Sequence, residues 1–292
     1  MLLKPDCIPC ILKMATSSIK KLTADEEVIK QLMTRVLQIP ALRGLNWGIT
    51  SPEAIETVMD IIMEEFHTLD PFRSLKQEQN AKALELYPKL KQLVEQSDDP
   101  LFCAVNLAIM GNSIDLMISD RSIDVENVLE QQLKDQVAEK HFRAFREKLG
   151  KAGSLLYLGD NAGEIVFDKV LIETINALYA PRVFFVVRGV PALNDVTITE
   201  ALEVGMDRVA TVISNGMKQP VPGTVLSRCS SELRELFQNC DLIISKGGGN
   251  FDSLEGEKDH FRKITFMLLA KCPPYSEYFK AQMYQPLLAN FF

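Results

Sequence analysis

The period of the apolar residues changes once along this chain, and that change constrains the fold more than any other feature. From Cys10 to about Leu149, apolar residues recur at spacings of three and four, which predicts successive amphipathic helices. Within them, the stretch 101–118 is apolar nearly all round and predicts a buried helix. After Gly150, short runs of Val, Ile, Leu and Phe alternate with helical stretches, the pattern of a parallel sheet with crossover helices.

This pattern predicts the α/β fold class with two domains. We expect a helical domain at 1–150, an α/β/α domain at 151–292, and the boundary at Leu149–Gly153. The expected strands are Ser154–Leu158, Arg182–Val187, Arg208–Ile213, Asp241–Ser245 and Ile264–Leu269. The expected helices between them are Gly163–Leu178, Ile198–Val204 and Val225–Phe237.

Charge and cysteine content exclude several classes of protein. The net charge of −7 gives no general attraction to phosphate backbones, so we expect no nucleic-acid partner. Six dispersed cysteines indicate reduced thiols rather than a disulfide framework, and no apolar run approaches the roughly 18 residues of a membrane span. We therefore expect a cytoplasmic protein that does not bind membranes. The three histidines form no His-x-x-x-His pair, which leaves little material for a histidine-based zinc site.

Small, charged and amide residues follow three of the predicted strands. Ligands of an open parallel sheet bind beyond the carboxyl ends of its strands, so these residues are expected to gather at one edge. The three segments are Gly159-Asp160-Asn161-Ala162-Gly163-Glu164, then Arg188-Gly189 with Asn194-Asp195, and then Lys246-Gly247-Gly248-Gly249-Asn250.

The residue types in these segments are suited to phosphoryl chemistry. Asp160, Asn161 and Asp195 offer hard oxygen ligands for magnesium or manganese. Lys246 can place an ammonium group against a phosphate, while the glycines after it allow a close approach of backbone N–H groups. The helix that begins near Gly163 would add its positive end.

Each segment also has a purely structural interpretation. The Asp-Asn pair could form a turn and cap a helix, Asp195 could cap the helix at 198, and the three glycines could form a tight loop. Their joint occurrence at three strand ends favours a site. Other motifs are missing from the sequence: Asp252 stands where a Gly-x-Gly-x-x-Gly motif needs its last glycine, and there is neither a P-loop nor a Gly-x-Ser-x-Gly elbow.

Cys7-Ile8-Pro9-Cys10 has the spacing of a second metal site or of a redox pair. A helix that starts just after Pro9 resembles the setting that lowers a cysteine pKa, although no strand precedes the motif. A structural pair is the alternative. The remaining cysteines are expected to be small buried residues: Cys103, Cys229, Cys240 and Cys272.

The strand-end segments resemble the ordered motifs of the damage-control phosphatases, formerly domain-of-unknown-function family 89. Lys4-Pro5-Asp6-Cys7-Ile8-Pro9-Cys10 is similar to the Cys-x-x-Cys opening of the prokaryotic branch of that family. The resemblance spans nearly the whole chain. It implies a Rossmann-like α/β/α domain under a multihelical N-terminal domain that covers the substrate.

The resemblance also implies an activity, which is the metal-dependent hydrolysis of phosphomonoesters of small metabolites such as sugar phosphates or phosphopantetheine-type compounds. Asp160, Asn161 and Asp195 would hold a divalent cation (Mg, Mn, Co or Ni), and Asp160, Asp195 and Lys246 would be catalytic. The expected contacts to the substrate or its phosphate are Lys246, Gly247, Gly249, Asn250, Glu164 and Arg188, together with Asn112 and Asp115 of a helical-side motif. The chain departs from the family at Gly248, where Gln is common, and at Asp252, where Glu is usual.

Two other functions are weighed against this one. A Rossmann-like sheet can hold S-adenosylmethionine in a methyltransferase, but no Gly-x-Gly follows the first strand. A non-catalytic metal or thiol-redox module would use Cys7 and Cys10. For the phosphatase, water and an aspartate both remain candidates for the nucleophile.

Overall fold

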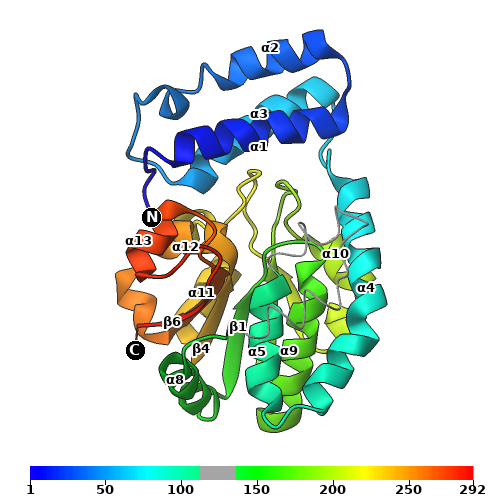
Figure 1. Ribbon diagram of the computed structural model, residues 1–292, viewed down its shortest axis with the longest axis vertical. Coiled ribbons are helices and arrows are strands. Elements are labelled where there is room, and N and C mark those ends of the chain that lie inside the picture. The colour runs from blue at the N-terminus through cyan, green and yellow to red at the C-terminus, as the bar shows by residue number, and fades with distance from the viewer. Residues whose placement is uncertain (112–135, 292) are drawn as a thin grey trace.

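A six-stranded sheet forms the centre of the computed structural model, which describes residues 1–111 and 136–291 (Figure 1). The strand order is β3-β2-β1-β4-β5-β6, with the first five strands parallel and β6 antiparallel to β5. The strands are β1 (Ser154–Leu158), β2 (Arg182–Val187), β3 (Thr211–Ser214), β4 (Leu242–Lys246), β5 (Ile264–Leu269) and β6 (Pro286–Asn290). The predicted α/β class with a Rossmann-like sheet is therefore confirmed.

Three of the five predicted strands match residue for residue, and β4 lies one residue later than expected. The strand expected from Arg208 begins only at Thr211, because Gly205 adopts a left-handed conformation (φ 68°) and is followed by a short 3₁₀ helix, Met206–Arg208. The sequence analysis missed β6. Its five residues form an edge strand whose pairing partner lies about twenty residues earlier in the chain.

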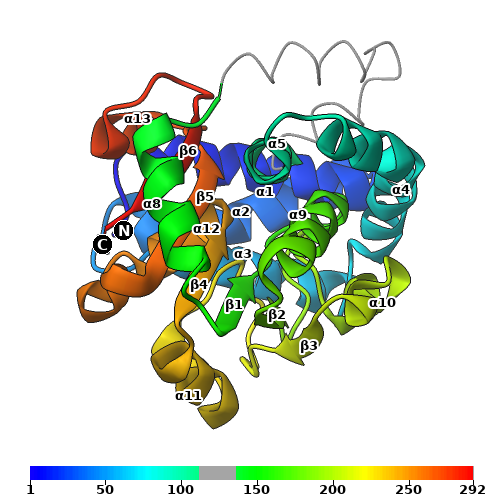
Figure 2. The same cartoon turned by 90° about the horizontal axis from the view of Figure 1, so that it is seen from below.

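Helices cover both faces of the sheet (Figure 2). Leu155 and Tyr157 of β1 share a core with the helices of one face, whereas Leu156 and Leu158 share a core with those of the other, as the period of a strand requires. The first face carries α5 (Pro100–Met110), α8 (Glu139–Leu149), α9 (Glu164–Tyr179) and α10 (Ile198–Glu203), with α4 (Arg73–Glu95) packed outside α9. The second face carries α11 (Ser231–Asn239), α12 (Gly247–Leu254) and α13 (Pro273–Phe279).

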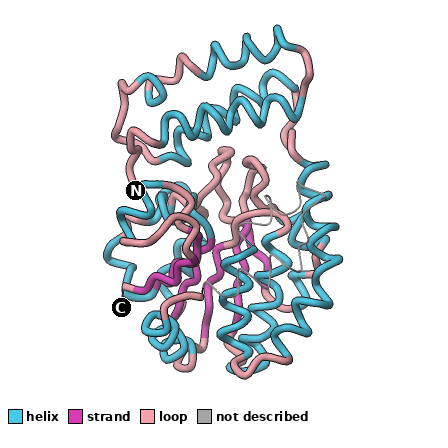
Figure 3. Tube along the Cα trace, viewed as in Figure 1, coloured by secondary structure: helices cyan, strands magenta, loops and turns pink. Residues whose placement is uncertain are grey.

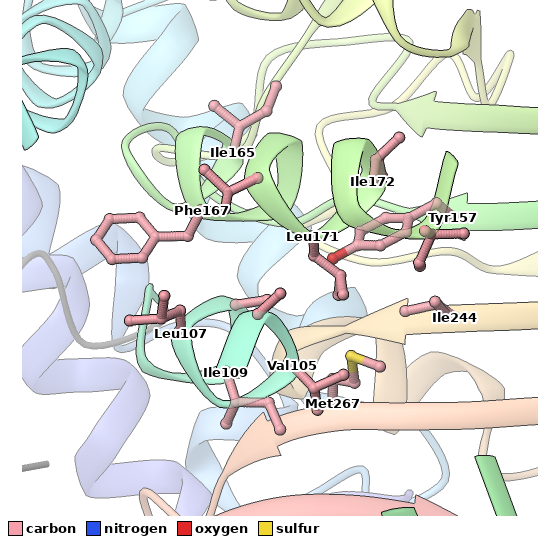
Figure 4. Close-up of a cluster of buried hydrophobic side chains, with 14 of the residues drawn as sticks. Val105, Leu107, Ile109, Tyr157, Ile165, Phe167, Leu171, Ile172, Ile244 and Met267 are labelled. Carbon is pink, nitrogen blue, oxygen red and sulfur yellow. The ribbon is translucent and has the colours of Figure 1, made fainter. Parts of the chain in front are cut away.

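The helix α5 is buried almost all round, as predicted, and it lies beside α9 on the same face of the sheet, where it packs against β5 (Figure 4). Its polar residue Asn106 is satisfied locally, because its amide donates to the Phe102 carbonyl (2.8 Å) and accepts from the Val137 N–H (3.0 Å). Residues 112–118 of the predicted helix lie outside the described residues. Apolar side chains from α5, α9 and three strands meet here, among them Val105, Ile109, Phe167, Leu171, Tyr157, Ile244 and Met267.

A separate bundle of three helices lies over the carboxyl edge of the sheet (Figure 1). It consists of α1 (Cys7–Leu22), α2 (Glu26–Val36) and α3 (Ser51–Phe66), which pack on one another around their own core of Ile11, Leu32, Val58 and Ile62. The bundle is joined to the sheet region by contacts between α3 and α12 and by an ion pair of 2.6 Å between Arg228 and Glu56.

The apolar cores do not follow the predicted division at Leu149–Gly153. The helices α4, α5 and α8 share one core with β1, β2 and β4, whereas α1–α3 have a core of their own. The boundary at 149–153 stays a prediction, and the cores lead us to propose an earlier boundary, between α3 and α4. No helix within residues 1–111 and 136–291 combines the length and apolar character needed to cross a membrane.

Candidate active site at the carboxyl edge of the sheet

The order of the strands reverses between β1 and β4, and loops at the carboxyl ends of the strands lie under the helical bundle (Figure 3). The strand β4 has no loop after it, because α12 begins directly at Gly247. A reversal of this kind opens a crevice at the carboxyl ends of the strands. The loop after β1 is paired with the loop after β2, because Asn161 and Asp195 form an antiparallel bridge and the Val196 N–H donates to the Asp160 carbonyl (2.9 Å). The predicted cation ligands Asp160, Asn161 and Asp195 are thus neighbours.

Arg188 connects all three strand-end segments and is only 2% exposed. Its Nε donates to Asp195 Oδ2 (2.6 Å), and its Nη1 donates to Asn250 Oδ1 (3.0 Å). Its Nη2 lies 3.5 Å from Asp160 Oδ1, and it makes no hydrogen bond within the part of the chain that the structure describes. The guanidinium group therefore offers a free donor beside two buried carboxylates.

Glycine is required where β4 ends. Gly247 has a φ of +75°, and a Cβ atom built there would lie 1.9 Å from Asp160 Oδ2. Asn250, one turn later, donates to the Gly159 carbonyl (3.0 Å) and to the Lys246 carbonyl (2.8 Å). The three glycines begin α12 rather than form a loop, and Gly249 lies against the Pro222 carbonyl, where a Cβ atom would be 2.0 Å from the oxygen.

Lys246 is completely buried beneath this edge. Its Nζ donates to the Ala108 carbonyl (2.8 Å), to Glu164 Oε1 (2.6 Å) and to Asp168 Oδ1. These acceptors take up all three ammonium protons, so the contact of Lys246 with a phosphate stays a prediction that needs a rearrangement of the site. Burial acts to lower the pKa of Lys246, but the carboxylates of Asp168 and Glu164 outweigh it and raise that pKa above its ordinary value.

Carboxylates outnumber cations among the described residues buried in the site. Within these residues, four acids face two bases, which are Asp160, Glu164, Asp168 and Asp195 against Arg188 and Lys246. Burial raises the pKa of Asp160, and the charges of Asp195 and Glu164 raise it further, against the opposing charges of Arg188 and Lys271. Burial also raises the pKa of Asp195, although Arg188 opposes the shift.

This excess of negative charge fits a divalent cation. Asp160 and Asp195 supply carboxylate oxygens, and Asn161 supplies an amide oxygen beside them; its amide nitrogen donates to Asp160 Oδ2 (2.8 Å). Among the described residues, no three His, Cys, Asp or Glu side chains are placed to hold a metal ion. A cation here would therefore have two carboxylates and one amide as protein ligands, with further positions left for water and a phosphate oxygen.

None of the three predicted ligands, Asp160, Asn161 and Asp195, caps a helix, so the structural interpretation of these residues as helix caps is wrong. The N-cap of α9 is Gly163, which makes no side-chain cap bond, so the Asp-Asn pair before it does not cap that helix. Thr197 caps α10 through a capping box with Glu200, which leaves Asp195 free of that function. The carboxylates of Asp160 and Asp195 are instead directed to Arg188.

Several residues of the site were not foreseen in the sequence. Asp168 accepts hydrogen bonds from Lys246 and from the Tyr157 hydroxyl (2.7 Å), and the sequence signal for it was a second acid four positions after Glu164, among the apolar residues at the start of α9. The other two are Asn80, whose Oδ1 accepts from the Gly163 N–H (2.8 Å), and Thr224, whose hydroxyl donates to Asn250 Oδ1 (2.8 Å). Their partners are distant in the chain, so no local pattern marks them.

The remaining predicted site residues lie elsewhere. Asn112 and Asp115 fall outside the described residues. Cys7 and Cys10 lie in the first turn of α1 and line a cavity beside α12 and α13, not the carboxylate cluster. Burial raises the pKa of Cys7, so the interpretation that this setting lowers a cysteine pKa is wrong.

The fold and the site together define a doubly wound α/β protein with an acidic, cation-compatible crevice at the point where the strand order reverses. Comparison with known proteins identifies the family within this class. The chain belongs to the damage-control phosphatase ARMT1-like domain family, whose sequence model matches residues 3–287. The resemblance inferred from the strand-end motifs is thereby confirmed.

Similar proteins extend over nearly the whole chain. A damage-control phosphatase of Archaeoglobus fulgidus is 32% identical over 94% of this chain and 94% of its own length. An uncharacterised protein of Methanocaldococcus jannaschii is 31% identical over 94% of this chain and 91% of its own. The crystal structure of a DUF89 family protein from Pyrococcus horikoshii superposes with a TM-score of 0.86 at 27% identity, covering 99% of both chains.

Proposed function

We propose that this protein is a metal-dependent phosphatase that hydrolyses phosphomonoesters of small metabolites, such as sugar phosphates or phosphopantetheine-type compounds. The observation that carries the proposal is the convergence of Asp160, Asn161 and Asp195 at the strand reversal, inside a site with more buried acids than bases. Membership of a phosphatase family supports it. Nothing in the described residues favours the methyltransferase alternative.

Asp160, Asn161 and Asp195 would hold the cation, for which magnesium, manganese, cobalt and nickel are the candidates. When bound, it would supply Lewis-acid polarisation of the phosphoryl group and would neutralise negative charge. The excess of buried carboxylates explains why a cation rather than another side chain would complete the site.

The chain itself would orient the reacting groups. Arg188 holds Asp195 in place through Nε, and its Nη2 would donate to a phosphate oxygen. Gly247 allows the start of α12 to approach Asp160, so that backbone N–H groups would face the substrate. The nucleophile would be a water molecule or the carboxylate of Asp160 or Asp195, and trapping of an acyl phosphate distinguishes the two.

Hydrolysis of a generic aryl phosphate tests this proposal. Protein stripped with EDTA should be inactive, and addition of each candidate metal in turn should show which one restores turnover. Asp160→Ala should abolish the restored activity, whereas Asp98→Ala, at an exposed position far from the crevice, should leave it unchanged. Activity that persists both in EDTA and in the Asp160→Ala variant would rule the proposal out.

The substrate class needs a separate measurement. A screen of sugar phosphates and phosphopantetheine-type compounds against protein loaded with the best metal should identify substrates with a kcat/KM well above that of the aryl phosphate. We also propose the cytoplasm as its location. Support comes from the six cysteines, which are all free thiols, as a reducing compartment would keep them.

A further inference from the structure

Three cysteines that are far apart in the sequence line one cavity. The cavity measures about 200 Å³ and lies between the first turn of α1 and the start of α13. Its lining includes Cys7, Cys10, Cys272, Asp252, Tyr275 and Lys271. We call it the thiol cavity. It is close to the candidate active site, because α12 contributes Asp252 to the cavity and Gly247 to the site.

The three thiols share one cavity but differ in their environment. Burial raises the pKa of Cys272 to about 11, and the charges of Asp252, Cys7 and Cys10 add to this shift. Cys7 and Cys272 are partly buried, whereas Cys10 is exposed and is therefore the thiol that a reagent in solution meets first. All three are free thiols.

The arrangement suits thiol chemistry better than metal binding. Among residues 1–111 and 136–291, no group of three His, Cys, Asp or Glu side chains is placed to hold a metal ion, and this includes the three thiols with Asp252. A structural zinc site needs four ligands in tetrahedral geometry. A disulfide needs only two sulfur atoms that can come together.

Cys7 and Cys10 are three positions apart at the start of α1, so their side chains lie on one face of the helix. Helical neighbours have Cβ atoms about 5–6 Å apart, whereas a disulfide needs about 3.5–4.5 Å. The first turn can tighten at low cost, because the N-cap Asp6 makes no side-chain cap bond and Pro9 has no N–H to lose.

We propose that the thiol cavity is a site of reversible oxidation by low-molecular-weight disulfides, which converts Cys7 and Cys10 into an internal disulfide. The Cys10 thiolate attacks one sulfur of the reagent RSSR, so that a Cys10–S–S–R bond forms and RS⁻ leaves. The Cys7 thiolate then attacks Cys10 Sγ and expels the second RS⁻. The two thiols lose two electrons and two protons, and RSSR gains them as two RSH.

Peptide mapping of the native protein tests this proposal, with glutathione disulfide as the reagent. The protein is incubated, quenched with acid, alkylated and digested with trypsin. Cys7 and Cys10 then lie in the peptide 1–13, since trypsin does not cleave after Lys4, which precedes Pro5, whereas Cys272 lies in the peptide 272–280. We expect peptide 1–13 to be two hydrogens lighter and unalkylated. Dithiothreitol should restore two alkylatable thiols in it.

Four outcomes would overturn the proposal: no modification by glutathione disulfide, a lasting mixed disulfide at Cys10, a cross-link between peptides 1–13 and 272–280, or one zinc ion retained per chain. Cys103→Ser serves as the matched control, since Cys103 is a partly buried thiol outside the thiol cavity, and it should leave the internal disulfide unchanged. Cys229 and Cys240 are buried and should be alkylated only after unfolding.

Discussion

Gly247 is the residue at which backbone conformation and the acidic site depend on each other most directly. Its φ of +75° disfavours any other residue, and a Cβ atom would be 1.9 Å from Asp160 Oδ2. We expect Gly247→Ala to displace the Asp160 carboxylate and to lower metal-stimulated hydrolysis by about 100-fold, since small misplacements at a catalytic centre have effects of this size.

The strain should also lower the free energy of unfolding by about 1–3 kcal/mol, measured by urea denaturation. Gly256→Ala is the control, because a Cβ atom there meets nothing within 4 Å. Equal activity of the two variants would mean that the approach of Gly247 to Asp160 does not matter.

We expect the buried carboxyl group of Asp252 to make the free energy of unfolding depend on pH. Burial raises its pKa from 3.8 to about 6, although the hydrogen bond from Ser51 opposes the shift. The folded state therefore binds the Asp252 proton more tightly than the unfolded state does. Through this group, the free energy of unfolding should fall by at most about 3 kcal/mol as the pH rises from about 4 to about 6. Above about pH 6 the contribution should level off.

Urea denaturation of the wild type and of Asp252→Asn, followed from about pH 4 to pH 7, checks this expectation. The wild type should lose stability relative to the variant as the pH rises through this window. Parallel curves would show that the carboxyl group is not perturbed in the folded protein.

At the scale of elements, a buried ion pair network joins α4 to α10. Lys76 of α4 is completely buried and lies 2.8 Å from Asp70 Oδ2 and 3.0 Å from Glu200 Oε1. Glu200 is itself buried and belongs to the capping box of α10. Lys76→Met should destabilise the protein by about 3–5 kcal/mol, because it leaves the carboxylate of Glu200 buried without its cation.

A second lysine of α4 provides the comparison. Lys82 pairs with Glu78 at 2.7 Å within the same helix, but its side chain is 33% exposed. Lys82→Met should therefore change the free energy of unfolding by no more than about 0.5 kcal/mol. Thermal or urea denaturation of both variants measures the two losses in the free energy of unfolding. Equal losses would show that burial of the ion pair does not determine its contribution to stability.

For the whole molecule, the excess of buried acids predicts that cations stabilise the fold. A cation that binds the folded state alone stabilises it by about 2.7 kcal/mol at a concentration of 100 times Kd. The Tm of protein stripped with EDTA should rise on addition of the activating metal, and Asp195→Asn should remove most of that rise. An equal rise in the variant would place the cation somewhere other than the carboxylate cluster.

Much of the sheet follows from the sequence alone. β1, β2 and β5 were predicted residue for residue, because each is a continuous apolar run between turn residues and needs no knowledge of its partners. The convergence of the three predicted cation ligands could be foreseen for the same reason, since parallel strands deliver their carboxyl ends to one edge whatever the details of packing. Local pattern failed at β6, which depends on a partner strand for its pairing.

Only the tertiary structure decided where the side chains of the site are directed. The sequence placed Lys246 at a strand end, but its burial between Glu164, Asp168 and the Ala108 carbonyl depends on α5 and α9 closing over it. Periodicity shows that a residue is buried, but not which distant residue it meets. For the same reason, periodicity could not predict that the helices of the first half belong to two apolar cores. It also could not predict that Cys272 lines one cavity with Cys7 and Cys10, because both features arise from contacts between segments that are remote in the chain.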